Sequence, residues 1–252
     1  NYLTEHILKL DTGTLRTLRK PLPPNNMQQH HIALLFLSET HLTDSTHYQI
    51  DGFSFFFSSG PNPASGVGVI ISPKFRPFVT SITPHTDRII EVHMNLQGPP
   101  LRIFGVYTPH QGKPPKQKIG PLHDPHHPDH KKDTRQQFWK KLKALVTPNP
   151  QAHPTLIVGD LNTRLQARLH TEHDVIGPHI YGKGPRFVDN TPTLNRPQAI
   201  NFCRQTEMLF ANTFKTPNLK QRVSYREIWQ APSRSLAPEN FQQLDHALIT
   251  RS

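Results

Sequence analysis

Short apolar runs bounded by polar residues recur along the chain and predict buried strands. Residues 32–39 read Ile-Ala-Leu-Leu-Phe-Leu-Ser-Glu, an apolar run that ends in two polar residues. A run of this length without helical spacing is typical of a strand that is buried on both faces. The same kind of pattern predicts further strands at 65–71, 89–94, 101–107, 155–158, 223–225 and 244–249, with the clearest alternation in 101–107.

Two segments have helical spacing. The first begins at Asp133 or Thr134, either of which can cap a helix, and its apolar side chains share one face: Phe138, Leu142 and Leu145. The second is predicted for residues 197–208. Strands that alternate with helices, together with several paired short strands, indicate a mixed α/β sandwich. We expect one domain over residues 1–252.

Three stretches lack a regular pattern. Residues 1–31 contain three prolines that would interrupt a helix: Pro21, Pro23 and Pro24. Residues 111–132 are rich in Pro, His and Lys and predict an irregular loop. Its histidines could bind a metal ion, but no strand or helix fixes their geometry, so a polar loop is the favoured interpretation. Residues 168–193 predict a second polar loop.

The charge of the chain points to a polyanionic partner. Lys and Arg number 29 against 18 Asp and Glu, which gives a formal net charge of +11 and a pI of about 10.0. Nucleic acid is the commonest partner of so basic a protein. The mean hydropathy of −0.58 is low, so long polar loops should surround the core.

Cysteine content and apolar run length exclude several classes. The single Cys203 excludes an internal disulfide framework and a cysteine-rich zinc site, and we expect it to be a small buried hydrophobe. The longest apolar run, residues 32–37, is too short to span a bilayer, and the chain lacks a secretory start. We therefore expect an intracellular protein with no membrane partner.

Three acidic residues each end or interrupt an apolar strand. Glu39 closes the first run, Asp160 follows Leu-Ile-Val-Gly, and Asp245 lies within Leu-Asp-His-Ala-Leu-Ile. A carboxylate in such a place is costly unless it is paired, hydrogen-bonded or bound to a metal ion. Each alone would be interpreted as a strand cap or a turn former. Three of them in one chain favour a functional site.

Four segments that contain these residues carry a family resemblance. They are Ser-Glu-Thr-His at 38–41, Val-Tyr-Thr-Pro at 106–109, Gly-Asp-Leu-Asn-Thr at 159–163 and Leu-Asp-His at 244–246. In this order and context they resemble the motifs of the endonuclease/exonuclease/phosphatase superfamily. The resemblance covers about residues 32–250 and is closest to the endonuclease domain of non-LTR retrotransposons and to apurinic endonucleases. It implies an α/β fold of the DNase I type, in which two packed mixed sheets are flanked by helices in four layers.

The resemblance also implies a role for each motif residue. Glu39 would be the main ligand of Mg²⁺, with Mn²⁺ as an alternative ion, because magnesium prefers oxygen ligands. Asp160 would orient or deprotonate the attacking water, and Asn162 would hold a phosphate oxygen. Tyr107 would hydrogen-bond the scissile phosphate or stabilise the leaving oxygen, and Asp245 would complete the catalytic set.

Three further residues would lie near the substrate. Thr163 ends the Gly-Asp-Leu-Asn-Thr motif. Ser224 occupies a place where relatives have a threonine, although a plain strand serine fits the pattern equally well. Thr14 takes the position of a metal-site asparagine in the first strand of the family, and a threonine lacks the reach and the donor pair of that amide.

Besides Thr14, the sequence departs from the family at the end of the chain. Relatives have a last strand with Ser-Asp-His, whose histidine pairs with the aspartate that Asp245 matches, and we expect the fold here to lack that strand. His246 is no substitute, because adjacent strand residues point to opposite faces. A missing general acid–base group typically reduces the rate by about 10²–10⁴-fold.

Three hypotheses for function follow. The leading one is a metal-dependent endonuclease that nicks DNA, part of a longer reverse-transcriptase polyprotein and nuclear when it acts. It requires no small-molecule cofactor. The alternatives are a phosphatase of the same superfamily that acts on a small phosphoester, and a degenerate DNA-binding remnant without catalytic activity. Cleavage of duplex DNA distinguishes the first from both alternatives.

Overall fold

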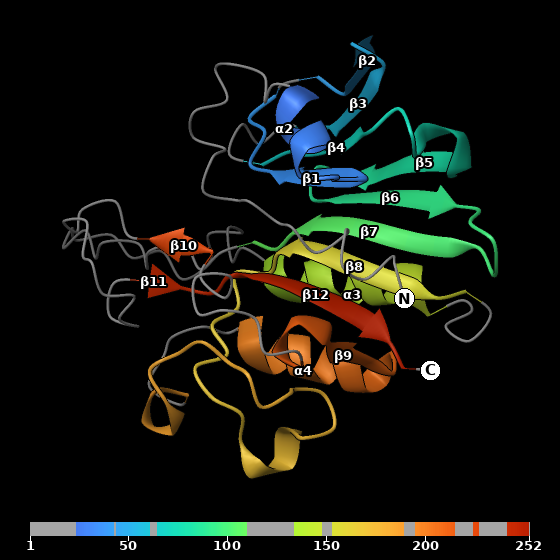
Figure 1. Ribbon diagram of the computed structural model, residues 1–252. Helices are drawn as coiled ribbons and strands as arrows, with labels where there is room; N and C mark the ends of the chain where they lie inside the picture. The colour runs from blue at the N-terminus through green and yellow to red at the C-terminus, as the bar shows by residue number, and fades with distance from the viewer. Residues whose placement is uncertain are drawn as a thin grey trace, which may run out of the picture.

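The computed structural model describes residues 24–42, 44–60, 65–109, 134–147, 153–188, 195–214, 224–226 and 241–251. Its strands form two main sheets (Figure 1). The smaller sheet has the order β1-β4-β3-β2, and all its pairs are antiparallel. These strands are β1 (Leu34–Ser38), β2 (Thr46–Ile50), β3 (Phe53–Ser58) and β4 (Val67–Ile71).

The larger sheet has the order β5-β6-β7-β8-β12-β9 and is mixed, because β7 and β8 run parallel. Its strands are β5 (Val79–Thr86), β6 (Ile89–Met94), β7 (Leu101–Tyr107), β8 (Thr155–Asp160), β9 (Met208–Phe210) and β12 (Asp245–Thr250). A small ribbon of β10 (Tyr225–Arg226) and β11 (Phe241–Gln242) lies beside it in Figure 1.

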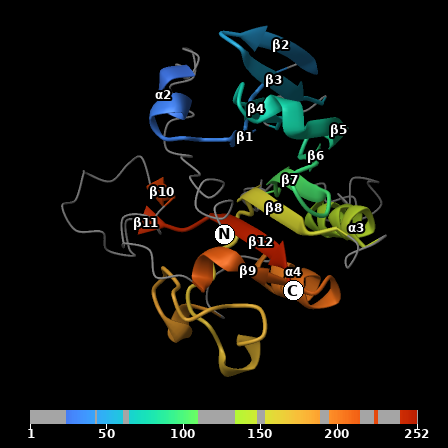
Figure 2. The same cartoon turned by 45° about the vertical axis from the view of Figure 1, so that its right-hand side comes forward.

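The two sheets pack face to face over a shared apolar layer. Alternate residues of each strand point into this layer, as the period of two in a strand requires. Phe36 and Val69 enter it from the smaller sheet, and Ile90, Ile103 and Val158 enter it from the larger one. All of them are buried. Figure 2 shows the smaller sheet above the larger sheet from a second direction.

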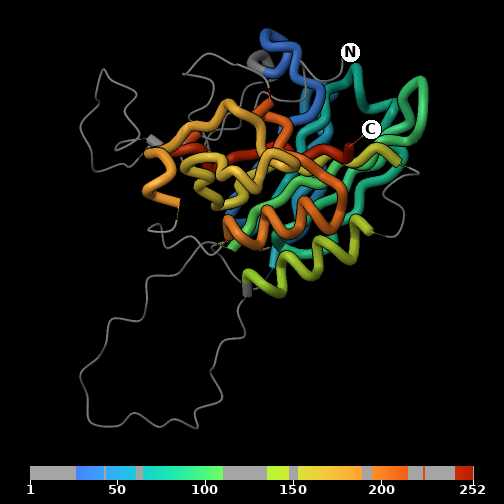
Figure 3. The backbone as a smooth tube through the Cα atoms, turned by 90° about the horizontal axis from the view of Figure 1, so that it is seen from below, coloured from blue at the N-terminus to red at the C-terminus, as the bar shows by residue number. Residues whose placement is uncertain are grey.

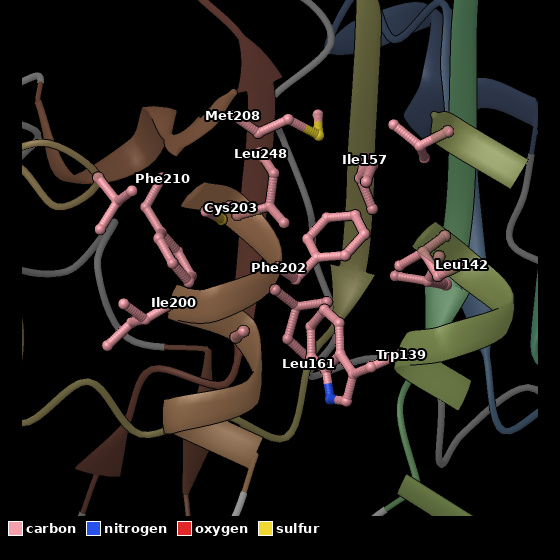
Figure 4. Packing of buried hydrophobic residues seen from close by; sticks show 14 of the residues in the cluster. Trp139, Leu142, Ile157, Leu161, Ile200, Phe202, Cys203, Met208, Phe210 and Leu248 are labelled. Carbon is pink, nitrogen blue, oxygen red and sulfur yellow. The ribbon is translucent and has the colours of Figure 1, made fainter. Parts of the chain in front are cut away.

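Two helices cover the outer face of the larger sheet. They are α3 (Thr134–Val146) and α4 (Asn195–Gln205), which lie side by side in Figure 3. Trp139 of α3 packs on Phe202 of α4 at a ring distance of 5.3 Å. Figure 4 shows these rings meeting Ile157 and Leu248 of the sheet. This apolar cluster holds both helices against the strands that carry the acidic residues.

The short helix α2 (Pro24–Gln29) covers the outer face of the smaller sheet through Met27, which packs with Leu35 and Phe55. The structure therefore has the four layers helix, sheet, sheet and helix that the sequence predicts. Among the described residues, no helix has the length and apolar content that crossing a membrane requires.

Several predicted elements coincide with observed ones. The strands expected at 89–94 and 101–107 are β6 and β7, with the same ends. The helix expected at 197–208 begins and ends earlier, and Met208 instead starts β9. The reason is local: Glu207 has a φ of 53°, which a helix does not allow. The 111–132 loop and Thr14 lie outside the described residues.

Two other predictions need correction. Pro24 does not interrupt a helix but begins α2, and a proline is tolerated in the first turn because its missing N–H would have no intrahelical partner there. The 168–193 segment is not simply a polar loop, since Val175, Ile176 and Tyr181 are buried. These side chains anchor the long connection between β8 and α4 to the core.

Candidate active site

The ends of three neighbouring strands bring the predicted acidic residues together. Tyr107 is the last residue of β7 and is in register with Asp160, the last residue of β8. On the other side of β8, Asp245 is the first residue of β12 and is in register with the same Asp160. The parallel pair and the antiparallel pair therefore place all three residues at one end of the larger sheet.

Glu39 reaches this place from the smaller sheet. It follows β1 directly, and the Tyr107 hydroxyl donates a hydrogen bond of 2.5 Å to its Oε1. Glu39 has a φ of 53°, an uncommon value for a residue other than glycine. Such strained backbone is often found at functional sites, where the surrounding structure holds it in place.

The turn after Glu39 is held by the chain just before β4. Thr40 N–H donates to Gly66 O at 3.2 Å, and His41 N–H donates to Ser65 O at 3.1 Å. Gly66 has a φ of 105°, and a Cβ there would lie 2.2 Å from Thr40 Oγ1. Only glycine allows this approach, which keeps Glu39 beside Tyr107.

Negative charge accumulates around Asp160. Protein atoms displace water from its carboxyl group and thereby raise its pKa well above the usual range, and the charges of Asp245 and Glu39 raise it further. A hydrogen bond of 2.7 Å from Asn162 N–H to Asp160 Oδ1 acts in the opposite direction. Without a cation, the site therefore disfavours the ionised form of Asp160.

Asn162 joins the ends of β7 and β8. Its side-chain Nδ2 donates to Thr108 O at 2.7 Å, and Thr108 N–H donates to Asp160 O at 2.9 Å. Asn162 has a φ of 45°, a left-handed conformation that asparagine tolerates better than most residues. The side chain therefore lies beside Asp160 and bridges to the strand end that carries Tyr107.

Ser224 and Thr163 occupy different surroundings. Ser224 Oγ accepts hydrogen bonds from the backbone N–H groups of Leu244 and Asp245, at 2.9 and 3.1 Å. It thus lies next to Asp245 and fixes the start of β12. Thr163 is fully buried, and its hydroxyl donates to Leu161 O at 2.9 Å, so the structure does not bring this hydroxyl to the acidic cluster.

Arg88 lies beside the cluster, although no motif had singled it out. Its guanidinium is 4.7 Å from the centre of the Tyr107 ring, and its Nη1 makes a long contact of 3.5 Å with Tyr107 O. Arg88 is half-buried. A guanidinium has five N–H donors, so most of them are left for another acceptor. Only its position before the β6 strand could have suggested it in the sequence.

The Tyr107 hydroxyl stays protonated. Burial raises the pKa of Tyr107 above its usual range, and the hydrogen bond to Glu39 and the charges of Glu39 and Asp160 raise it further. The hydroxyl is therefore a donor throughout the pH range in which proteins are stable. It can donate to Glu39 or to an oxygen of a bound phosphate.

His246 lies on the opposite face of β12 from Asp245, as strand alternation predicts. Its Nε2 contacts Thr163 O at 2.9 Å, and its ring meets that of Phe210 edge to face. Burial lowers the pKa of His246 to about 4, although the hydrogen bond to Thr163 acts the other way. The neutral ring therefore supports the chain after Asp160 and does not face the acidic cluster.

The donor set suits a divalent cation of the magnesium type. Among the described residues, no three His, Cys, Asp or Glu side chains are arranged to hold a metal ion by themselves. Magnesium does not need such a cage, because it commonly binds one or two carboxylates, several waters and a substrate phosphate. Glu39 and Asp160 offer carboxylate oxygens on either side of Tyr107, and Asp245 is in register with Asp160. These residues therefore fit the ion.

Comparisons with known proteins find similarity at the level of family and fold. The Endonuclease/Exonuclease/phosphatase family model matches residues 15–251. Among solved structures, the chain is similar to the AP endonuclease LMAP from Leishmania major, with a TM-score of 0.58 and 14% identity, over 97% of this chain and 76% of that one. It is also similar to the endonuclease domain of TRAS1, a telomere-specific non-LTR retrotransposon, with a TM-score of 0.49 and 12% identity, over 96% and 80% of the two chains. No curated protein sequence matches.

Proposed function

The chain belongs to the Endonuclease/Exonuclease/phosphatase family, and from this premise we propose that it is a metal-dependent endonuclease that nicks DNA. Members of this family are metal-dependent phosphodiester hydrolases. The observation that carries the proposal is the convergence of Glu39, Tyr107, Asp160 and Asp245 at one end of the two sheets. Retrotransposon origin, a longer reverse-transcriptase polyprotein and a nuclear place of action belong to the same proposal and rest on the four sequence motifs.

Each residue has a role in the proposed reaction. Glu39 would hold the divalent cation, which would supply positive charge to the scissile phosphate and the leaving oxygen. Asp160 orients the attacking water and accepts its proton, a role that suits a carboxylate of raised pKa. Asp245 is the acidic neighbour of Asp160, and its charge adds to the effect of burial in raising the pKa of Asp160.

The remaining groups act on the phosphate. The Tyr107 hydroxyl donates to a phosphate oxygen, and the Arg88 guanidinium beside its ring adds a positive charge near that oxygen. Asn162 lies next to Asp160 for a further phosphate contact. Ser224 and Thr163, which were expected to contact substrate, act in this scheme on the backbone of Asp245 and of the chain after Asp160. Thr14 keeps the substrate role expected from the sequence.

The proposed products are a 5′-phosphate and a 3′-hydroxyl. Water attacks phosphorus and gives a proton to Asp160, the P–O3′ bond breaks, and the leaving O3′ takes up a proton from solvent. The basic balance of the chain, with a formal net charge of +11, favours a polyanionic duplex over a small phosphoester.

The test compares substrates of different classes. A labelled DNA duplex, an inositol phosphate and a nucleotide are each incubated with the protein and Mg²⁺, with EDTA as the control. We expect nicking of the duplex only, with ends that a DNA polymerase extends. Hydrolysis of a small phosphoester without nicking would favour a phosphatase. Salt-sensitive binding of the duplex without hydrolysis of any substrate would favour a binding remnant.

A further inference from the structure

Asn195 is a buried polar residue that contacts both strand ends of the site without reaching the acidic cluster itself. It is the first residue of α4 and is only 3% exposed. Its Nδ2 donates to Pro109 O at 3.0 Å and makes a longer contact of 3.4 Å with Asn162 O. A buried amide that is hydrogen-bonded in this way holds the segments it joins in place.

The two acceptors occupy equivalent places in the chain. Pro109 comes two residues after Tyr107, and Asn162 comes two residues after Asp160. The strands β7 and β8 pair up to Tyr107 and Asp160, and Thr108 is linked once more to each of Asp160 and Asn162. Beyond Thr108, the Asn195 amide supplies the next hydrogen-bonded connection between the two segments, at the point where they leave the sheet.

Trp139 sets the direction of the Asn195 amide. Its indole Nε1 donates to Asn195 Oδ1 at 3.4 Å. An indole nitrogen can only donate, so the oxygen of the amide must face α3 and its NH₂ group must face the strand ends. The amide therefore offers its two N–H donors to two carbonyl oxygens.

We propose that Asn195 is a positioning residue of the active site, which holds the strand ends that carry Tyr107 and Asp160 in register. This inference rests on the proposed function. Reacting groups must stay within a narrow range of positions, and a displacement of about 1 Å can reduce a rate by about 100-fold. Asn195 acts through Pro109 and Asn162 and touches neither metal nor phosphate.

Two substitutions separate hydrogen bonding from packing. Asn195→Ala removes the donors and some volume. Asn195→Asp keeps the shape and the acceptor for Trp139 but turns one carboxylate oxygen, in place of the NH₂ group, toward the two carbonyl groups. If the amide donors matter, kcat for duplex nicking falls about 10- to 100-fold in both variants, more in Asn195→Asp, while KM and duplex binding in Ca²⁺ change less than about twofold.

Thr206→Val is the matched control. Thr206 is buried at the other end of α4, where its hydroxyl donates to Phe202 O at 2.8 Å. We expect this variant to melt lower, as Asn195→Ala does, but to keep the kcat of the wild type. Loss of kcat in both variants would mean that general destabilisation is the cause and would overturn the proposal, as would a milder effect of Asn195→Asp than of Asn195→Ala.

Hydrogen exchange tests the inference even if the wild type does not cleave DNA. The Thr108 amide donates to Asp160 O across the two strand ends, whereas the Val92 amide lies in β6, away from α4. We expect about tenfold faster exchange at Thr108 in Asn195→Ala, with no change at Val92. Unchanged exchange at Thr108 would refute the positioning role, and an inactive wild type would refute only the proposed function.

Discussion

Asp160 is the residue at which the electrostatic cost of the site is concentrated. Its carboxyl is shielded from water, and Asp245 and Glu39 add negative charge around it, which raises its pKa. A carboxyl whose pKa is raised on folding stabilises the folded state only below its unfolded pKa. That contribution is lost as the pH rises through the folded pKa. At neutral pH without metal, the ionised residue therefore lowers the free energy of unfolding.

Replacing the Asp160 carboxyl by an amide in Asp160→Asn removes this charge. In EDTA at neutral pH, we expect the variant to be more stable than the wild type by about 0.5–2 kcal/mol, because an amide carries no charge. The difference should shrink as the pH falls and the wild-type carboxyl becomes protonated, and the variant should not cleave DNA. Urea unfolding at several pH values measures it. A variant that is less stable than the wild type at neutral pH would contradict this account of the charge.

His246 gives a pH dependence of the opposite sign. Burial lowers its pKa to about 4, below the ordinary value of 6.5. A histidine with a lowered pKa stabilises the folded state above its unfolded pKa, and this contribution is lost as the pH falls toward the folded value. We therefore expect the free energy of unfolding to fall between about pH 6.5 and pH 4, by at most about 1.4 kcal/mol per pH unit from this residue.

The matching variant is His246→Gln, which keeps a donor for Thr163 O. Its unfolding free energy should fall less steeply over the same pH interval, whatever its absolute value. Urea unfolding measured from pH 7 to pH 4 compares the two slopes. Equal slopes in the two proteins would show that His246 is already free to take up a proton in the folded state.

Some residues of the site could be found from the sequence and others could not. Glu39, Asp160 and Asp245 could be found because each ends or interrupts an apolar strand, and the motifs placed Tyr107 and Asn162 beside them. Arg88 and Asn195 follow no motif of this kind. Their contacts with the strand ends of the site exist only after the sheet and the helix layer have formed.

At the scale of elements, the strands that could be predicted from the sequence are mainly the buried ones. The strands β1, β4 and β6 to β8 are mainly buried, and their apolar runs are visible in the sequence. Every residue of β2 is exposed, so its composition gives no run. The signal that was missed is Asp51-Gly52 between β2 and β3, with φ values of 51° and 79°, a pair that favours a tight hairpin turn.

The strand β5 was missed for another reason. It lies at the edge of the larger sheet, contains Pro84 and is irregular between Pro84 and Thr86. Proline is tolerated in edge strands and at bulges, because a ladder hydrogen bond is missing there. Because Pro84 lies in a polar stretch, the sequence pattern did not predict β5, and its pairing with β6 identifies it as a strand.

The pairing of β7 with β8 depends on Gly159. This residue has a φ of 143°, and a Cβ there would lie 2.0 Å from Val106 O, a backbone atom that cannot move aside. We expect Gly159→Ala to lower the free energy of unfolding by about 3 kcal/mol or more, because it adds a clash to the backbone strain. Thermal and urea unfolding measure the loss.

Gly98→Ala is the control for this substitution. Gly98 has a similar φ of 148°, but nothing lies within 4 Å of the place of its Cβ. It should therefore show the backbone strain alone, about 1–3 kcal/mol. Equal losses in the two variants would mean that the close approach of Gly159 to β7 contributes nothing to stability.

At the scale of the whole molecule, the site belongs to neither sheet alone. Glu39 comes from the smaller sheet, whereas Tyr107, Asp160 and Asp245 come from the larger one. Their meeting therefore depends on the apolar layer between the sheets, in which the Tyr107 side chain is itself buried. The pattern of the sequence predicted a mixed α/β sandwich and the family resemblance implied its layers, but the packing of one sheet against the other determines which strand ends meet.

The most direct test of the central claim is nicking of supercoiled plasmid in Mg²⁺ by the wild type, Glu39→Gln and Glu207→Gln. Glu207 is an exposed acid between α4 and β9, and its backbone carbonyl accepts a hydrogen bond from Arg251 N–H, just beyond the end of β12 that lies farthest from Asp245, so its variant controls for loss of negative charge. The wild type and Glu207→Gln should nick the plasmid equally, and Glu39→Gln should be at least about 100-fold slower. Equal nicking by Glu39→Gln and the wild type would contradict the assignment of the metal site to the ends of these two sheets.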